Sequence, residues 1–398
     1  MATDRDTITT TNGRLADAIG AARIMVVDDM PLMRRLIGET LEQAGFTHID
    51  YAEDGDVALD RIGATRPDLV VLDIAMPRMD GLAVCRALRD DPAFADLPVV
   101  VQSAFGDADE RSAVFAAGGT DFISKPINRA ELVARVRMHV ENRALIADLR
   151  DYRARMETEL ALARHMQHSL LPRSEQVRDM EQRLGARLES LYQASEALGG
   201  DLWGGWPLPD GRVALYVLDI AGHGVGAAMN TFRVHTAIAN CAHLADRPDA
   251  FMTALDRALS RSFGEEQFAT MLFLVLDGES GALDYVAAGT PPPIILAGDG
   301  ARFLDGSGLP LGIAPETERP VRHDRLSPGE SLFLYSDALM ESPDRSGHMG
   351  DGAEIARRVA ALMDAAEKEP VLPRLMTDIF GDDHLALDDD LTLLLLCR

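Results

Sequence analysis

Short apolar runs alternate with amphipathic stretches over the first third of the chain, from Arg23 to about Asn142. This alternation indicates strands connected by helices, and it is typical of a parallel sheet covered by helices on both faces. The segments are Ile24–Val27, Leu32–Ala44, Leu69–Asp73, Gly81–Arg89, Val99–Ser103, Asp109–Ala117, Asp121–Ile123 and Arg129–Val140. Residues 23–142 are therefore predicted to form a doubly wound α/β domain, after a flexible tail over residues 1–22.

The next segment has a helical periodicity. Apolar or tolerable residues recur at steps of three and four, with charged residues between them, which is the a/d pattern of a coiled coil. The positions are Met138, Asn142, Leu145, Leu149, Tyr152, Met156, Glu159, Ala163, Met166 and Leu170, with Glu159 the one poor core position. We predict a helical linker over residues 143–172 that dimerises as a parallel coiled coil. A plain surface helix remains the alternative.

Beyond about Gly185, alternating strands with turns are interrupted by blocks of helix. Strands are expected at Val213–Asp219, Ala269–Asp277, Ala282–Ala287, Ile294–Leu296, Ser331–Ser336 and Leu391–Leu396, and helices at about Gly226–Leu244, Pro248–Phe263 and Gly352–Lys368. Sheets that alternate with helical blocks predict an α/β sandwich over residues 173–398, distinct from the first domain. The overall fold class is therefore α/β.

Charge narrows the possible partners. The 398 residues include 39 Lys and Arg against 64 Asp and Glu, a formal net charge of −25, which disfavours nucleic acid and anionic membranes. Three separated cysteines without a C-x-x-C pair suit a reducing compartment. No signal-peptide pattern or membrane-length apolar run is present, so we expect a cytoplasmic protein.

Three acids mark the strand ends of the first domain. Asp28 and Asp29 follow the first apolar run, and Asp73 ends the run Leu69–Asp73. Ligand sites of open α/β sheets lie outside the carboxyl ends of the strands, so these carboxylates are expected to converge. Like charges in one pocket favour a bound cation, and Mg²⁺ prefers oxygen ligands. The sequence therefore predicts a magnesium site.

Two further strand ends add a hydroxyl and an ammonium group. Ser103 ends the fourth strand, and Lys125 follows the fifth. A hydroxyl, a lysine and a divalent ion around one aspartate would stabilise phosphoryl oxygens. Asp73 is thus a candidate nucleophile that becomes an aspartyl phosphate. An ordinary helix cap would explain any one of these residues, but not all five in this order.

The stretches "MVVDDM", "LDIAMPRMDG", "QSA" and "SKP" make residues 23–142 resemble a response regulator receiver domain. The resemblance implies Asp73 as phosphoacceptor, with Asp28, Asp29 and the Ala75 backbone around Mg²⁺. It further implies Ser103 as switch hydroxyl, Lys125 as phosphate contact and Phe122 as switch aromatic. The partner implied is a sensor histidine kinase.

A second set of acids lies in the last two hundred residues. Asp201 follows a glycine pair, Asp219 ends an apolar strand, Asp337 ends another strand, and Asp389 and Asp390 precede the last strand. If folding gathers these acids, they need cations. Two Mg²⁺ or Mn²⁺ ions about 3.5–4 Å apart would activate a water and neutralise phosphate oxygens, which indicates phosphoester hydrolysis.

Residues from about Ala163 onward resemble the bacterial metal-dependent Ser/Thr protein phosphatases of the PPM type that act in sigma-factor control and sporulation. The matching stretches are "MQHSLLP", "LGGDLWG", "LDIAGHGVGAA", "FATMLFLVLD", "AAGTPPPIIL", "GLPLGI", "LFLYSDALME" and "DDDLTLLLL". The ligands implied by the resemblance are Asp201, Asp219, the Ile220 carbonyl, Asp337 and Asp389. Asp389 is preferred over Asp390 because the family motif reads D-D-x-T and its first acid is the ligand.

Three positions depart from the phosphatase pattern. Gly204 stands where many relatives carry an acid, Ala338 replaces a glycine, and Thr290 replaces a histidine. The resemblance implies a phosphatase controlled by receiver phosphorylation, acting on a phosphorylated anti-sigma-factor antagonist of the STAS type. The alternative is a receiver-gated pseudo-phosphatase that sequesters a regulatory partner protein.

Overall fold

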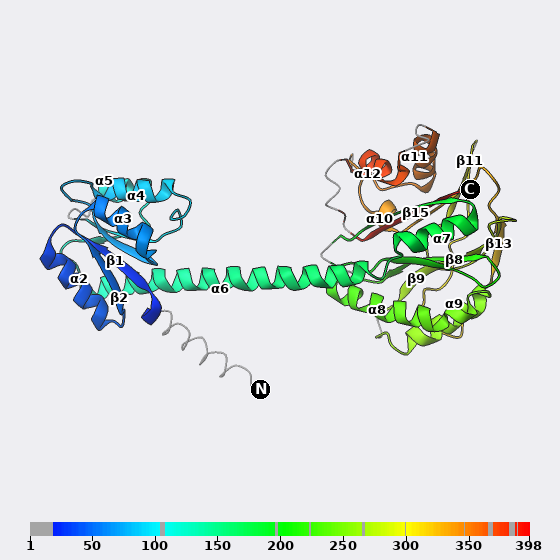
Figure 1. The fold of residues 1–398 in the computed structure, drawn as a ribbon, viewed down its shortest axis with the longest axis horizontal. Helices are drawn as coiled ribbons and strands as arrows, with labels where there is room; N and C mark the ends of the chain where they lie inside the picture. Colours follow the sequence, from blue (N-terminus) through cyan, green and yellow to red (C-terminus); the bar gives the residue numbers. More distant parts are fainter. Residues whose placement is uncertain are drawn as a thin grey trace. The chain divides into compact units, whose positions relative to one another are not determined.

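The computed structural model describes residues 19–103, 108–195, 198–222, 224–264, 267–298, 300–345, 347–364, 369–381, 387 and 389–398. Most of the predicted N-terminal tail, residues 1–18, lies outside the described residues. The chain divides into two compact units, Met1–Arg155 and Met156–Arg398 (Figure 1). Each unit is described separately below.

The first unit contains a parallel five-stranded sheet of order β2-β1-β3-β4-β5. Its strands are β1 (Arg23–Val27), β2 (His48–Ala52), β3 (Leu69–Asp73), β4 (Val99–Ser103) and β5 (Asp121–Ser124), and its helices are α2 (Pro31–Gln43), α3 (Gly55–Thr65), α4 (Gly81–Asp90), α5 (Ala108–Ala116) and the start of α6 (Arg129–His168). The predicted doubly wound α/β domain is confirmed. In this strand order the switch point lies between β1 and β3, where the acidic strand ends meet.

Two apolar cores cover the two faces of this sheet, as expected of central parallel strands. All five residues of β3 and of β4 are buried. One core contains Val70, Leu72 and Val84, and the other contains Ile24, Val71 and Val136. Because successive strand residues point to opposite faces, Val70 and Val71 lie in different cores, and both faces exclude water.

Helix α6 is a single helix that begins in the first unit and ends in the second. Its first turns pack on the sheet through Leu132, Val136 and Val140. Other large apolar side chains of α6, most of them in the predicted linker, are exposed to solvent: Met138, Leu145, Ile146, Leu149, Tyr152, Met156, Leu162 and Met166. Five of these belong to the predicted a/d stripe up to Met156, so this stripe is exposed to solvent in the described part of the chain.

The second unit is built on two antiparallel five-stranded sheets, with orders β13-β10-β9-β8-β7 and β12-β11-β14-β15-β6. The first sheet comprises β7 (Leu202–Pro207), β8 (Val213–Ile220), β9 (Ala269–Leu276), β10 (Ala282–Ala288) and β13 (Arg322–Arg325). The second comprises β6 (Arg187–Gln193), β11 (Ile294–Ala297), β12 (Gly300–Phe303), β14 (Ser331–Tyr335) and β15 (Leu391–Cys397). The expected α/β sandwich is confirmed.

Three apolar cores lie between the layers of the sandwich. One lies between the sheets and includes Leu215, Leu274 and Leu394. Another joins the first sheet to helices α8 (Gly224–Cys241) and α9 (Pro248–Ser260), and the third joins the second sheet to α11 (Gly352–Asp364) and α12 (Val371–Phe380) (Figure 1). Helix α7 (Ser174–Leu184) precedes β6 and adds Met180 and Leu184 to the inter-sheet core, while the short α10 (Ala338–Glu341) follows β14.

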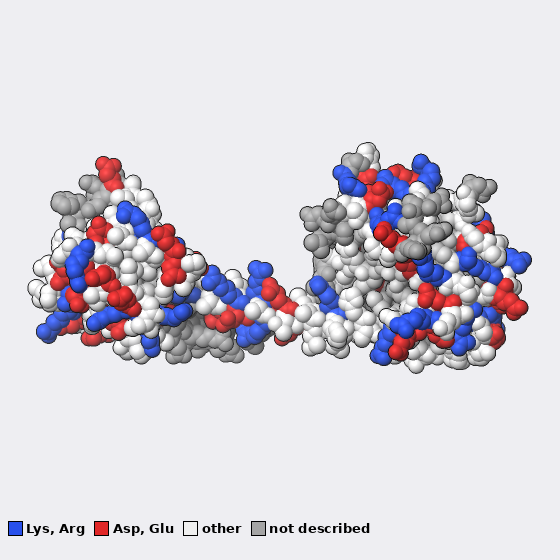
Figure 2. Space-filling view, turned by 45° about the horizontal axis from the view of Figure 1, so that its top comes forward, with Lys and Arg blue, Asp and Glu red and all other residues white. Residues whose placement is uncertain are grey.

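Acidic and basic side chains are interspersed over the visible face of each unit (Figure 2). No helix in the described part of the chain combines the length and apolar character needed to cross a membrane.

Two acidic sites at strand ends

The first acidic site lies at the carboxyl ends of β1 and β3. Asp28, Asp29 and Asp73 each offer a carboxylate oxygen, and these atoms all lie within 4.8 Å of one another. Asp28 and Asp73 are buried. Asp28 Oδ1 accepts a hydrogen bond from the Met30 backbone N–H at 2.9 Å, whereas Asp28 Oδ2 has no hydrogen-bond partner among the described residues. A buried carboxylate oxygen without a donor suits a cation, so these residues fit a magnesium ion.

Lys125 supplies the positive charge at this site. Its Nζ lies 2.7 Å from Asp73 Oδ2 and 3.7 Å from Asp28 Oδ2. Burial raises the pKa of Asp28, and the Asp73 charge raises it further against the opposing effects of the Met30 N–H and Lys125. One ammonium therefore does not fully compensate the carboxylates, and an added divalent cation would do so.

The remaining predicted receiver residues lie on β4, on β5 and in the loop after β3. Ser103 is buried at the end of β4, one residue beyond Gln102, which pairs with Asp73. Ala75 is exposed in the loop after β3. Phe122 on β5 is half-buried, and the Arg111 guanidinium lies over its ring at 4.7 Å from the centroid.

Sequence reasoning missed Asp54, which positions the loop after Asp73. Its buried carboxylate caps α3 through the Gly55 N–H and also accepts the backbone N–H groups of Arg78 and Met79, at 3.2 and 2.9 Å. Asp followed by Gly after a strand is a capping signal, but its long-range bonds are visible only in the fold. Gly81 serves the same loop, since a Cβ there would lie 2.3 Å from the Asp73 carbonyl oxygen.

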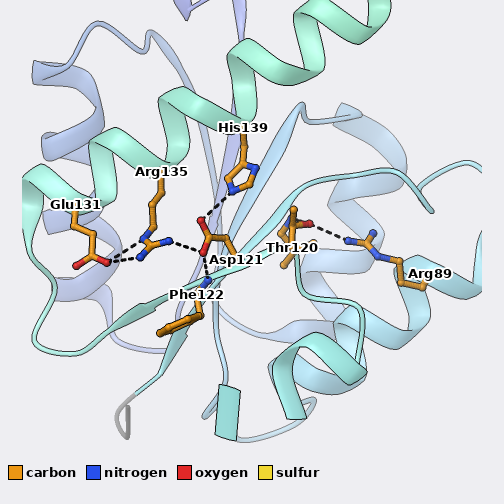
Figure 3. A network of polar contacts seen from close by, with 8 residues as sticks. Arg89, Thr120, Asp121, Phe122, Glu131, Arg135 and His139 are labelled. Atoms are coloured by element: carbon orange, nitrogen blue, oxygen red, sulfur yellow. Dashed lines mark hydrogen bonds and ion pairs between the residues drawn. The ribbon is translucent and has the colours of Figure 1, made fainter. Parts of the chain in front are cut away.

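A polar network joins β5 to α6 (Figure 3). Asp121 accepts from Arg135 Nη1 at 2.6 Å and contacts His139 Nε2 at 3.0 Å, and Arg135 also pairs with Glu131. The Arg135 guanidinium lies 5.7 Å from the centroid of the Phe122 ring. Burial alone would raise the pKa of Asp121, but the hydrogen bonds from Arg135 and His139 lower it overall. Asp121, the neighbour of Phe122 in the sequence, is thus hydrogen-bonded to the helix that follows β5.

The second acidic site draws on both sheets of the sandwich. Asp201 lies just before β7 and Asp219 lies within β8, both in the first sheet. Asp337 follows β14, and Asp389 and Asp390 precede β15, in the second sheet. Strands β14 and β15 are paired, as are β7 and β8, so neighbouring strand ends present these acids.

Burial and neighbouring charges affect the acids of this site. Burial raises the pKa of Asp219, and the charges of Asp337 and Asp389 raise it further, to about 7. Burial and the Asp219 charge raise the pKa of Asp201 well above its ordinary value. Neither carboxylate oxygen of the buried Asp201 has a hydrogen-bond partner in the described part of the chain. These residues therefore fit divalent cations, which would satisfy both the oxygens and the charge.

The acids of the second site are more widely spaced than those of the first. Among the described residues, only the receiver carboxylates form a group of three with ligand atoms all within 4.8 Å. Ligands shared between two ions would be spread more widely than those of a single-ion site.

Asp389 and Asp390 have different environments. Asp390 is buried and accepts the N–H and hydroxyl of Ser195, at 2.8 and 3.0 Å, and the N–H of Gly200. Its oxygens are thus occupied in holding the loop before Asp201. Asp389 is half-buried, and the charges of both Asp389 and Asp390 act on Asp219. The hydrogen bonds of Asp390 make it the anchor of the loop before Asp201.

Close backbone approach explains the glycine pair before Asp201. A Cβ on Gly200 would lie 2.8 Å from the Ile220 carbonyl oxygen, and a Cβ on Gly199 would lie 2.7 Å from Asp390 Oδ2. The Ile220 carbonyl, a predicted ligand, therefore lies against the Asp201 loop.

The three departures from the phosphatase pattern occupy different surroundings. Gly204 pairs with Tyr216 across β7 and β8, and a Cβ there would lie 2.5 Å from the Tyr216 hydroxyl oxygen. A larger side chain at 204 would thus meet this tyrosine. Ala338 is buried at the start of α10, next to Asp337. Thr290 hydrogen-bonds through its backbone N–H to Gly306 at 3.1 Å.

Comparisons with known proteins agree with this geometry. Residues 24–137 match the family model "Response regulator receiver domain", and residues 209–398 match "Stage II sporulation protein E (SpoIIE)". The response regulator MprA of Mycolicibacterium vanbaalenii is 45% identical over 115 residues, which are 29% of this chain and 48% of MprA. The response regulator PleD of Caulobacter vibrioides is 39% identical over 134 residues, 34% of this chain and 29% of PleD. The chain thus spans about half of MprA and less of PleD.

Among solved structures, the PP2C domain of SiaA from Pseudomonas aeruginosa superposes with a TM-score of 0.52 at 19% identity, covering 62% of this chain and 98% of that domain. At this identity the likeness concerns the fold alone. The chain therefore joins a response regulator receiver domain to a phosphatase domain of the SpoIIE type with a PP2C fold.

Proposed function

We propose that this chain is a response regulator in which phosphorylation of Asp73 controls a metal-dependent phosphoserine and phosphothreonine protein phosphatase. The observation that carries the proposal is the buried Asp201, whose unpartnered oxygens lie in the field of Asp219 within a PP2C fold. A carboxylate in this state is costly unless a cation binds it. The receiver match supports the regulatory half of the proposal.

In the receiver, Asp28, Asp29, Asp73 and the Ala75 backbone would hold Mg²⁺. Lys125 Nζ, 2.7 Å from Asp73 Oδ2, is placed to contact a phosphoryl oxygen on that carboxylate. Ser103 would supply the switch hydroxyl and Phe122 the switch aromatic. The phosphodonor is a sensor histidine kinase, in keeping with the receiver class.

In the phosphatase domain, Asp201, Asp219, the Ile220 carbonyl, Asp337 and Asp389 would hold two Mn²⁺ or Mg²⁺ ions. When bound, such ions activate water and neutralise phosphate oxygens. The chain itself positions the acids: Asp390 fixes the loop before Asp201 through Gly200 and Ser195. The substrate we propose is a phosphorylated anti-sigma-factor antagonist of the STAS type, in keeping with the SpoIIE match.

Helix α6 is the proposed route between the domains. Arg135 and His139 tie it to Asp121, next to Phe122, and its exposed stripe includes Leu145 and Leu149. We propose that two copies of the chain associate through this stripe as a parallel coiled coil. Phosphorylation would then act on the phosphatase domain through the position of α6. The net charge of −25 disfavours nucleic acid as a partner, and the proposed place of action is the cytoplasm.

Hydrolysis of p-nitrophenyl phosphate with and without Mn²⁺ tests the enzymatic half. We expect manganese-dependent turnover by the wild-type chain and its loss in Asp219→Ala. Absence of turnover by the wild type, together with tight binding of a phosphoprotein, would favour the pseudo-phosphatase. For the regulatory half, the rate on a phosphorylated STAS protein is compared between wild type and Asp73→Asn, with a small phosphodonor present. Equal rates would contradict the coupling.

A further inference from the structure

One buried polar side chain interrupts the exposed surface at the C-terminal end of α6. Gln167 is 3% exposed, whereas Met166 beside it is 52% exposed and His168 is also exposed. Burying an amide is costly unless its donors and acceptor are all hydrogen-bonded. The contacts of Gln167 therefore explain why a glutamine is tolerated at this position.

The Gln167 amide is bonded to two separate segments of the phosphatase domain. Its Nε2 donates to the Gly199 carbonyl oxygen, and its Oε1 accepts the Gly199 N–H at 3.2 Å. The same Nε2 lies 3.3 Å from Thr231 Oγ1 on α8, and this hydroxyl donates to the Ala228 carbonyl at 2.6 Å. The reciprocal pair with Gly199 fixes both the position and the orientation of that peptide backbone.

Gly199 lies two residues before Asp201, in the loop that precedes β7. From the opposite side, Asp390 accepts the Gly200 N–H, so the loop is held between α6 and the start of β15. A Cβ at Gly199 would also lie 2.7 Å from the Tyr192 hydroxyl oxygen, which leaves the loop little room to move. Gln167 and Asp390 thus hold the loop before Asp201 from its two sides.

We propose that Gln167 is a positioning residue for the metal centre, through which the last turn of α6 controls the affinity of Asp201 for a divalent ion. The proposal rests on the proposed function, because it requires that Asp201 bind metal. Gln167 reaches Gly199 from one face of the helix only, so rotation or withdrawal of this turn breaks the reciprocal pair. The linker helix thus acts on the site by a direct contact, two residues from a ligand.

The test measures Mn²⁺ affinity and turnover of the full-length chain for Gln167→Ala and the isosteric Gln167→Glu. Gln167→Glu keeps the shape and an acceptor but loses the donors to Gly199 and Thr231. Free Mn²⁺ is followed by electron paramagnetic resonance in an Asp28→Asn/Asp29→Asn background, which removes the receiver site, and p-nitrophenyl phosphate turnover is titrated with Mn²⁺ in parallel. Loss of a group that orients a metal ligand typically lowers affinity about 10–100-fold.

We expect both variants to bind Mn²⁺ at least about tenfold more weakly, with most of the turnover number recovered at saturating Mn²⁺. Val275→Ala is the control, because Val275 is buried in the same domain, on β9, toward the end away from Ala269. It should lower stability and leave Mn²⁺ affinity unchanged. Wild-type affinity in both glutamine variants, or an equal loss in Val275→Ala, would overturn the proposal. Failure of the wild type itself to bind Mn²⁺ would instead overturn the proposed function.

Discussion

A buried ion pair in the phosphatase domain allows a quantitative prediction. Asp256 on α9 and Arg319 have side chains that are 0% and 2% exposed, with Arg319 Nη2 2.5 Å from Asp256 Oδ2. Asp256 Oδ1 also accepts the Gly312 N–H at 2.7 Å, and Arg319 donates to the Leu309 and Pro310 carbonyls. The pair thus holds the segment 309–312, in which Leu311 pairs with Ala269 at the start of β9.

We predict that Arg319→Met destabilises the phosphatase domain by about 3–5 kcal/mol, the typical cost of removing one partner from a buried pair. Asp256 would lose two guanidinium contacts, leaving the Gly312 N–H as its main donor. For a domain of this size each kcal/mol shifts Tm by about 2–4 °C, so a drop of roughly 6–20 °C is expected. Because the pair itself carries a desolvation cost, Asp256→Leu/Arg319→Met should recover much of the loss.

Tryptophan fluorescence measures the change in Tm of the phosphatase domain. Both tryptophans of the chain, Trp203 and Trp206, lie on β7, so their signal reports unfolding of the phosphatase domain. The matched control is Arg257→Ala. Arg257 neighbours Asp256 on α9 and pairs at 3.2 Å with Glu316, but those side chains are 55% and 80% exposed. An exposed pair contributes about 0–1 kcal/mol. Equal losses in Arg319→Met and Arg257→Ala would refute the reasoning.

Three further predictions concern the receiver and the linker. Gly81→Ala should destabilise the receiver and slow Asp73 phosphorylation, because the added Cβ would lie 2.3 Å from the Asp73 carbonyl oxygen; Gly63→Ala on α3, with nothing within 4 Å, is the control, and gel-shift assays of the phosphoprotein measure the rate. The hydrogen bonds that lower the pKa of Asp121 stabilise the receiver above its unfolded pKa of about 3.9 and are lost as pH falls through the lower folded pKa. Hydrogen exchange of β5 should therefore show a larger loss of protection in wild type than in Asp121→Asn between neutral pH and about pH 3, and parallel curves would contradict this. Leu149→Lys, at a position that is 66% exposed, should shift the chain from dimer to monomer in sedimentation, whereas Arg153→Lys should not; a wild-type monomer would contradict the coiled-coil proposal.

The strand pattern predicted the receiver fold because parallel strands buried on both faces give continuous apolar runs. The run Leu69–Asp73 coincides with β3, and Val99–Ser103 coincides with β4. The second strand, His48–Ala52, lacks such a run, because only Ala52 of its five residues is fully buried. The same applies to β12 and β13, which are exposed or half-buried edge strands. Edge strands lack the apolar signal on which periodicity depends.

The candidate site was predictable where acids follow apolar strands. Asp73, Asp219 and Asp337 each carry that local signal. The residues that hold the site loops in place carry no such local signal. Asp390 acts on Ser195 and Gly200, nearly two hundred residues away in the sequence. In the sequence, Gln167 is one polar residue among many on an exposed helix. Its burial results from the packing of Gly199 against it, which only the structure shows.

The most direct test of the central claim is calorimetric titration of the full-length chain with Mn²⁺, in wild type, in Asp28→Asn/Asp29→Asn and in Asp219→Ala. Buried acids in each domain require divalent ions in this account. The two sets of variants should therefore each lose part of the wild-type binding, and the lost parts should be additive. Wild-type protein that binds no Mn²⁺, or Asp219→Ala that binds as much as wild type, would contradict the account.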